Sequence, residues 1–230
     1  MALVMEFMSE QISLVVVAST GGAVLNQLLH NSFFKSRVHS VISDRECGAI
    51  AKARIHGVRT QVIPEKDRKR ISQLVLAYLK EHQADYAISF FSKLFVGELL
   101  SVYRDRIINL HPSLLPSFKG LHGFDDAIAG GVKFVGSTIH FIDENMDEGK
   151  IIQQTIAAVD ETTPLVTRHR IFEQQCRSLL QVIKWLEDDR VVVEGKRVRV
   201  KGAAFEDAEF SPNLDFDQAI SLDIPKPDWL

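Results

Sequence analysis

Cysteine is scarce in this chain, and its scarcity argues against two kinds of small, cross-linked fold. Only Cys47 and Cys176 occur among 230 residues, and they lie far apart without any paired spacing. Disulfide frameworks and zinc knuckles both need sets of cysteines at characteristic intervals. We therefore expect neither, and the composition fits a reducing compartment.

Long apolar runs and a strong excess of charge are also missing. No segment approaches the roughly 20 apolar residues of a membrane helix, and residues 1–11 lack a basic start followed by a long apolar stretch. The formal net charge is -3, the pI is near 6.2, and the basic residues between 65 and 70 alternate with acids. We expect a cytoplasmic protein that acts on small molecules, not on nucleic acid or membranes. Its oligomeric state stays open, with a homodimer as one option.

The first half of the chain alternates apolar, β-branched runs with helical patterns. Each helical pattern would return the chain over a sheet face, which implies parallel pairing of the strands. This rhythm predicts a doubly wound α/β sheet, mostly parallel and Rossmann-like, with helices on both faces. The expected strands are 12–19, 38–43, 60–64, 85–91 and 106–110, and the expected helices are 23–33, 46–57, 71–83 and 93–103.

The second half has longer β-type runs, at 134–143 and 149–159, on either side of an acidic loop. The stretch 164–187 carries apolar residues at helical spacing and is predicted to form one long helix. The run 190–202 suggests a terminal hairpin.

The chain shows no internal repeat and no clear linker. We expect an N-terminal tail at 1–11, a single α/β domain at 12–202 and a C-terminal extension at 203–230. The extension is rich in Asp and Pro, so we expect it to be extended or loosely docked.

Two polar residues stand at the end of the expected strand 106–110. Asn109 and His111 are two apart, so they share a face if the strand continues through them. Ligands of open parallel sheets gather beyond the carboxyl ends of the strands, and Pro112 and Pro116 would stiffen the chain that follows. Taken alone, however, Asn-x-His is better explained by a turn hydrogen bond and a strand cap.

The surrounding motifs are more specific. HPSLLP is followed by FKGLHGFDDAI and by GSTIHFIDENMDEGKIIQQ. Through these motifs the chain resembles the glycinamide ribonucleotide (phosphoribosylglycinamide) formyltransferase family, the folate-dependent formyltransferases of purine synthesis. The resemblance covers residues 12–188 and is strongest over 107–154. It implies that 10-formyltetrahydrofolate is the co-substrate and that Asn109, His111 and Asp147 form the catalytic set.

These implied roles agree with the chemistry. An amine that attacks a formyl carbon creates an oxyanion, which a protonated imidazole and a carboxamide N–H stabilise. A nearby carboxylate favours the charged imidazole and can move the amine proton away through water. The resemblance gives supporting roles to His140 and Ser113, although a satisfied strand histidine explains His140 nearly as well.

A metal site is the alternative use of these side chains. The types of His111, His122, His140 and Asp147 suit zinc, but no close-spaced ligand pair such as H-x-x-x-H is present. We therefore expect no metal.

The resemblance also places two ligand sites. An apolar slot with backbone amides would hold the flat pterin, although the same residues could simply fill the core. The implied folate-binding residues are Phe91, Ser92, Lys93, Leu94, Ile107, Leu121, Ile142, Asp143 and Glu144, with Ser92-Lys93 in place of the family's Met-Arg pair. The implied acceptor-binding residues are Thr20, Gly21, Gly22, Gly120, His122, Glu173 and Gln175.

The acceptor side departs from the family pattern. The family's first turn reads S-G-x-G-S-N and binds the ribonucleotide phosphate, whereas residues 19–24 read STGGAV, so Ala23 and Val24 replace the Ser-Asn pair. Gln175 stands where the family has a glutamate, with Glu173 two residues earlier. An intact catalytic set beside an altered acceptor side predicts retained chemistry with a changed substrate.

We therefore expect formyl transfer to a primary amine, with glycinamide ribonucleotide as the acceptor implied by the family. Amino-sugar nucleotides and hydroxylated ornithine, which related enzymes accept, are alternatives. Hydrolysis of formyltetrahydrofolate is another, although related deformylases usually carry an extra regulatory domain. A folate-binding paralogue without catalysis would have no need to keep the three catalytic residues, and the turn at 20–22 does not make the G-x-G-x-x-G pattern of nicotinamide binding.

Overall fold

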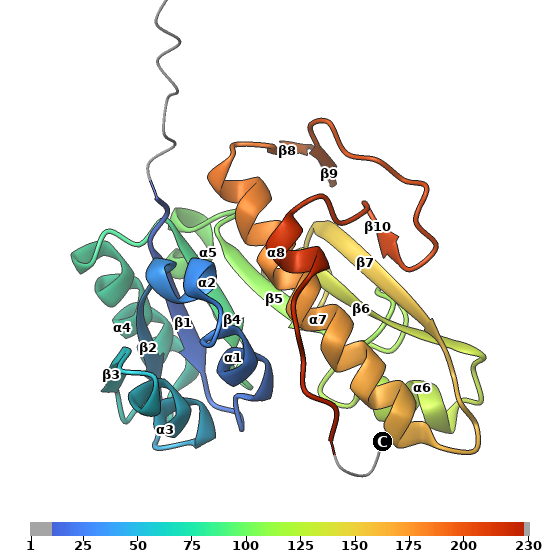
Figure 1. The fold of residues 1–230 in the computed structure, drawn as a ribbon. Helices are drawn as coiled ribbons and strands as arrows, with labels where there is room; N and C mark the ends of the chain where they lie inside the picture. Colours follow the sequence, from blue (N-terminus) through green and yellow to red (C-terminus); the bar gives the residue numbers. More distant parts are fainter. Residues whose placement is uncertain (1–10, 228–230) are drawn as a thin grey trace, which may run out of the picture.

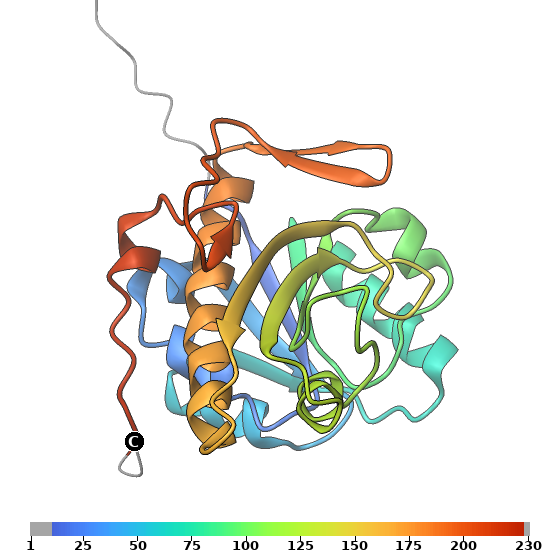
Figure 2. The ribbon, with the colours of Figure 1, turned by 90° about the vertical axis from the view of Figure 1, so that its right-hand side faces the viewer.

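A central sheet of eight strands organises the molecule (Figure 1). The computed structural model describes residues 11–227, so nearly all of the expected N-terminal tail lies outside the described residues. The strand order is β10-β7-β6-β5-β4-β1-β2-β3, and a separate hairpin, β8-β9, extends away from this sheet (Figure 2). The strands are β1 (Leu14–Ala18), β2 (Val38–Ser43), β3 (Arg59–Val62), β4 (Tyr86–Phe90), β5 (Ile107–His111), β6 (Phe134–Phe141), β7 (Ile151–Ala158), β8 (Val191–Glu194), β9 (Arg197–Val200) and β10 (Phe210–Ser211).

The first five strands are parallel, as their crossovers predicted. β1 pairs with β2 and β4, β2 with β3, and β4 with β5, all in parallel. β6, β7 and β10 then extend the sheet by antiparallel pairing. The chain builds β1 to β3 outward on one side and returns to place β4 on the other side of β1. The sheet is therefore doubly wound and mixed, with its switch point between β1 and β4.

Helices cover both faces of this sheet, because β1 is apolar on both sides. Leu14 and Val16 face the cluster that contains α1, α3 and α7, whereas Val15 and Val17 face the cluster that contains α4 and α5. Figure 1 shows α7 running along β6 and β7. The helices are α1 (Ala23–Leu28), α2 (Ser32–Arg37), α3 (Gly48–Ile55), α4 (Arg68–Glu81), α5 (Glu98–Val102), α6 (Gly123–Ala129), α7 (Pro164–Glu187) and α8 (Asp217–Ile220). None of those within residues 11–227 combines the length and apolar character needed to cross a bilayer.

Two expected helices are wrong in extent. The helix expected at 23–33 is divided into α1 and α2, because the Asn31 side chain accepts a hydrogen bond from Phe34 N–H and starts a new helix. The helix expected at 93–103 is reduced to α5, because Gly97 has a φ of 72° and breaks the run. Elsewhere β2 and α7 match their predicted bounds, and the hairpin is confirmed.

The C-terminal segment is packed, so the expectation of a loosely docked tail is wrong. β10 pairs with the edge strand β7, and α8 packs against α7. Phe210, Ala219 and Leu222 are buried there. A few apolar residues are enough to dock a segment whose average composition is polar.

Hydrogen bonds of Asp215 link this C-terminal segment to α7. Its Oδ1 accepts hydrogen bonds from Gln181 Nε2 at 2.7 Å and Trp185 Nε1 at 3.0 Å, and its Oδ2 accepts one from an N–H of Arg190 at 2.7 Å. Gln181 and Trp185 are fully buried. Burial raises the pKa of Asp215, but these three hydrogen bonds outweigh burial and bring the pKa below its ordinary value of 3.8.

We predict that Asp215→Ala lowers the free energy of unfolding by about 2 kcal/mol, because it leaves buried donors of Gln181 and Trp185 without their acceptor. Urea denaturation followed by tryptophan fluorescence measures the loss. Asp223→Ala is the matched control, since only the carbonyl oxygen of Asp223 is engaged among the described residues. Equal stability of Asp215→Ala and wild type would contradict the assigned role.

The gap in stability between wild type and Asp215→Ala should also depend on pH. A carboxyl group whose pKa is lowered by folding stabilises the fold above its unfolded-state pKa, and this contribution is lost as the pH falls through the folded-state pKa. We expect a constant gap between pH 7 and pH 5 that narrows below about pH 4. Urea titrations at each pH would refute this if the gap widened on acidification.

Candidate active site

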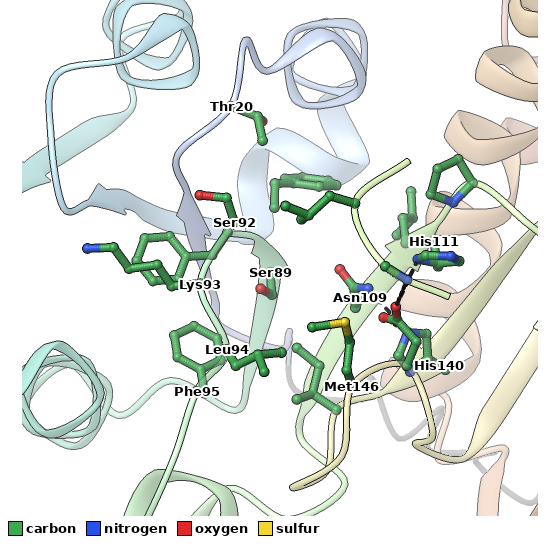
Figure 3. A pocket seen from close by; sticks show the side chains of 18 of the residues that line it. Thr20, Ser89, Ser92, Lys93, Leu94, Phe95, Asn109, His111, His140 and Met146 are labelled. Atoms are coloured by element: carbon green, nitrogen blue, oxygen red, sulfur yellow. Dashed lines mark hydrogen bonds and ion pairs between the residues drawn. The ribbon is translucent and has the colours of Figure 1, made fainter. Parts of the chain in front are cut away.

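A cavity of about 320 Å³ opens beyond the carboxyl ends of β1, β4 and β5, at the switch point of the sheet. The predicted catalytic set, Asn109, His111 and Asp147, lines it. Figure 3 shows Asn109, His111 and His140 on one side of this cavity and Leu94 on the other. We call it the first cavity.

His111 has a partner at each ring nitrogen. β5 runs through Asn109 and His111, so the two side chains share a face, as their spacing predicted. His111 is buried, with its Nε2 2.9 Å from the carbonyl oxygen of Phe118 and its Nδ1 3.6 Å from Oδ2 of Asp147. A carbonyl only accepts, so Nε2 carries a proton and donates it. Nδ1 faces the Asp147 carboxylate, so the two groups are placed to interact.

The loop after β5 holds this pair in place. The N–H of Gly120 donates to Oδ2 of Asp147 at 2.7 Å, and Asp147 itself has a left-handed φ of 54°. A Cβ on Gly123 would lie 2.7 Å from the Phe118 carbonyl oxygen and 2.8 Å from Nε2 of His111. Only glycine therefore lets the loop come this close to the imidazole.

Ser113 helps to hold the same loop in place. Thr138 on β6 donates through Oγ1 to the Ser113 carbonyl oxygen at 2.7 Å and accepts from the Leu115 N–H at 3.1 Å. Ser113 Oγ donates in turn to the Ser117 carbonyl oxygen at 2.7 Å. Ser113 is buried and does not line the first cavity, so its contacts stabilise the loop.

His140 lies opposite Asn109 in the β5-β6 pairing and is held in one tautomer. Its Nδ1 lies 2.9 Å from the carbonyl oxygen of Phe141, so Nδ1 carries the proton. Its Nε2 then has a free lone pair, which accepts a hydrogen bond from Nδ2 of Asn109 at 3.2 Å. This bond orients the Asn109 carboxamide and leaves its second N–H for a ligand.

The charge of His140 follows from its burial. Burial lowers the pKa of His140 and outweighs the hydrogen bond to Phe141 and the charge of Asp147, which both raise it. Nε2 lies 3.9 Å from Oδ1 of Asp147, yet the two do not form an ion pair near neutral pH because the ring is uncharged. The Asp147 carboxylate is therefore available to interact with His111.

The wall opposite the histidines is apolar. Phe91 and Phe95 stack with their ring centroids 5.5 Å apart. Leu94 on this wall remains 36% exposed, and Met146, which lies near Asn109 and His140 in Figure 3, remains 44% exposed. Large apolar side chains that stay exposed around a cavity suit a flat, largely apolar ligand.

Ser92 and Lys93 are engaged within the protein. The hydroxyl oxygen of Ser92 lies 2.9 Å from that of Ser19, and Nζ of Lys93 lies 2.6 Å from Oδ2 of Asp44. In Figure 3 the Lys93 side chain extends away from the wall that carries His111. The lysine charge is thus neutralised by Asp44 on the far side of the cavity.

Several implied ligand residues lie outside the first cavity. Ile107 is 1% exposed in the core, and Asp143 and Glu144 line a separate hollow. Gly21 and Gly22 line a shallow hollow at the start of α1. The implied folate, acceptor and supporting residues that do line the first cavity are Thr20, Phe91, Ser92, Lys93, Leu94, Gly120, Leu121, His140 and Ile142.

A second cavity, of about 470 Å³, adjoins the first between the start of α1, α6 and α7. Pro112 and Leu121 line both cavities, so the two meet beside His111. His122 and Gln175, two of the predicted acceptor-binding residues, line the second cavity. Glu173 lines neither cavity and lies 3.5 Å from His169 on α7.

Some of the residues that line the two cavities were not predicted from the sequence. Leu165, Arg168 and Phe172 line the second cavity, and their three- and four-residue intervals on α7 were a usable signal because they share a helix face with Gln175. Met146 lines the first cavity, and its position next to Asp147 could have indicated this.

In the part of the chain that the structure describes, no three or more His, Cys, Asp or Glu side chains are grouped so that they could hold a metal ion. Both cysteines are free thiols. Burial raises the pKa of Cys176, which therefore stays protonated in the core.

Comparison with known proteins gives a consistent result. The model of the formyl transferase family matches residues 13–183. A phosphoribosylglycinamide formyltransferase from Mycobacterium tuberculosis (strain ATCC 25618 / H37Rv) is 33% identical over 192 residues, which cover 80% of this chain and 88% of that protein. The crystal structure of glycinamide ribonucleotide transformylase 1 from Symbiobacterium toebii has a TM-score of 0.76 at 32% identity, covering 83% of this chain and 94% of that one.

Similarity extends to a second activity. The crystal structure of a formyltetrahydrofolate deformylase from Pseudomonas syringae pv. tomato has a TM-score of 0.71 at 26% identity, covering 84% of this chain and 67% of that one. The same fold and part of the same sequence pattern are therefore found in proteins named for transfer and in proteins named for deformylation.

The assigned state of His140 is directly measurable. We predict that its imidazole is neutral at pH 7, with the proton on Nδ1, because burial lowers the pKa from 6.5 and Phe141 accepts from Nδ1. Long-range ¹H–¹⁵N spectra of histidine-labelled protein distinguish the two tautomers and the charged ring, and His140→Gln identifies the signal. A charged ring at pH 7 would contradict the hydrogen bond to Asn109.

Proposed function

The chain belongs to the formyl transferase family, and on this basis we propose that it transfers a formyl group from 10-formyltetrahydrofolate to a primary amine. The observation that carries the proposal is the meeting of two cavities beside His111: one with an apolar wall for a flat pterin, the other open for an acceptor. Asn109, His111 and Asp147 lie at the first of these.

The proposed reaction begins with attack of the neutral amine on the formyl carbon. The developing oxyanion receives the second N–H of Asn109, whose carboxamide is oriented by the neutral ring of His140. The imidazolium of His111 adds positive charge beside the same oxygen. Both groups are held before the reaction, so the protein needs little reorganisation as charge develops.

Proton transfer completes the exchange. Asp147 accepts the proton that the amine loses, through a water molecule, and the carbon–nitrogen bond to the folate breaks. The folate nitrogen takes up a proton as it leaves, so the products are the formamide and tetrahydrofolate. Asp147 suits this role because the N–H of Gly120 and the ring of His111 fix its position.

Hydrolysis is the second candidate, because a protein named as a deformylase shares the fold. The same three side chains would then direct water instead of an amine at the formyl carbon. The second cavity favours transfer, since water needs no space of about 470 Å³ next to the reacting carbon. The relatives' names make glycinamide ribonucleotide the first acceptor to test.

The experiment is to follow tetrahydrofolate formation from 10-formyltetrahydrofolate by the purified protein. Glycinamide ribonucleotide, a panel of amino-sugar nucleotides and an acceptor-free control run in parallel. Acceleration by an amine supports transfer, whereas equal turnover in every tube supports hydrolysis. No turnover in any tube would contradict both.

We predict that His111→Ala and Asp147→Asn each lower kcat by about 10²- to 10⁴-fold, because each removes a group that stabilises charge or moves a proton in the transition state. His82→Ala, at the C-cap of α4 and outside both cavities, is the matched control and should keep full activity. Steady-state rates together with thermal melting separate lost chemistry from lost folding. Rates like wild type in either of the first two variants would refute the mechanism.

A further inference from the structure

The second cavity has a mostly apolar lining. Val24, Phe124, Leu165, Ile171 and Phe172 line it from three separate helices. Leu165 is 56% exposed, although it lies beside the cavity. Phe124 and Ile171 are already buried, so a ligand would remove from water mainly Leu165 and the half-buried Val24 and Phe172.

The charges around this cavity do not suit an anion. Arg168 is paired with the carboxylate of Asp125, and its guanidinium lies 4.6 Å from the centre of the Phe124 ring. If an anion drew Arg168 away, it would meet the Asp125 carboxylate that also lines the cavity. His169 already lies 3.5 Å from the Glu173 carboxylate.

The side chains at the turn before α1 add little to anion binding. The side chains of Ala23 and Val24 carry no hydrogen-bond donor, and both line the cavity. Nζ of Lys52 lies 2.8 Å from the Gly21 carbonyl oxygen, so this ammonium group is bound to the turn itself. A phosphate would therefore find few free donors among these side chains.

The cavity is also correctly placed for an acceptor. It shares Pro112 and Leu121 with the first cavity, so a molecule in it can extend an amino group towards His111. The Asp147 carboxylate lines the first cavity, so it can attract an ammonium group that reaches this junction.

We infer that the acceptor is a primary amine with an apolar, aromatic-sized body, whose only charge is its ammonium group, and not a phosphorylated amine. This inference rests on the proposed function. The apolar body lies against Val24, Leu165 and Phe172, and the amino group passes between Pro112 and Leu121 to the formyl carbon.

The test compares tyramine with O-phosphotyramine, which differ only by the phosphate, beside glycinamide ribonucleotide and 2-phenylethylamine. Formyl transfer by the full chain is measured for each at saturating 10-formyltetrahydrofolate. We expect kcat/KM for tyramine and 2-phenylethylamine to exceed that for both phosphorylated amines by at least about tenfold. A preference for either phosphorylated amine would overturn the inference and leave the proposed function standing.

Leu165→Ser tests the apolar lining of the second cavity without disturbing the core, because this side chain is more than half exposed. The KM for tyramine should rise by about tenfold, while the KM for the formyl donor stays unchanged. Ile55→Ser is the matched control, since Ile55 is 81% exposed on α3 and lines neither cavity. Equal effects of the two substitutions would overturn the inference.

Binding without the donor separates this inference from the proposed function. Saturation-transfer NMR of tyramine and O-phosphotyramine with the protein alone should show tyramine contacts that Leu165→Ser weakens and Ile55→Ser does not. This result together with no transfer to any amine would contradict the proposed function but support the ligand preference of the cavity. Absence of tyramine binding, or stronger binding of O-phosphotyramine, would overturn the inference.

Discussion

The candidate active site depends on the antiparallel pairing of β6 with β5. This pairing puts Asn109 opposite His140, and Thr138, two pairs further along and opposite His111, holds the loop that follows His111. β5 is parallel to β4 on its other side, so it stands where the sheet changes from parallel to antiparallel. The switch in strand direction therefore brings a second strand's side chains to the carboxyl end of the parallel sheet.

Burial and hydrogen-bond partners give the two histidines different properties. His140 is deeply buried, its pKa is lowered, and its uncharged ring orients Asn109. His111 donates to a carbonyl through Nε2 and has the Asp147 carboxylate beside Nδ1. The single carboxylate lies within 4 Å of both rings, at 3.6 Å and 3.9 Å, but only His111 is placed to pair with it in the charged form. Two histidines of the same chemistry thus acquire different roles through their hydrogen-bond partners.

Local pattern was sufficient to predict most of the fold. The β-branched runs of β1, β2 and β4 and the apolar spacing of α7 are strong signals because each element is buried along most of its length. The errors arose where one side-chain contact overrode the pattern. Asn31 divides a helix by capping the next one, and Asp215 docks a polar tail through three hydrogen bonds.

The candidate site was only partly predictable from the sequence, because some of its contacts join residues that are far apart in the chain. Asn109, His111 and Asp147 were singled out because the family motif carries them, although Asn109 and His111 also share one strand. The pairing of Lys93 with Asp44 could not be read from the chain, since these residues come from different strand ends. The second cavity combines residues near 24, 124 and 168, so its apolar character emerges only when α1, α6 and α7 pack together.

The most direct measurement is a crystal structure with a stable analogue of 10-formyltetrahydrofolate in which carbon replaces the formyl-bearing nitrogen. We expect the pterin to lie against Phe91, Leu94 and Met146, with the formyl oxygen within about 3.5 Å of Asn109 and His111. We also expect His140 to keep its hydrogen bond to Asn109. An analogue bound in the separate hollow beside Asp143 and Glu144, or with its formyl group turned away from His111, would contradict the proposed mechanism.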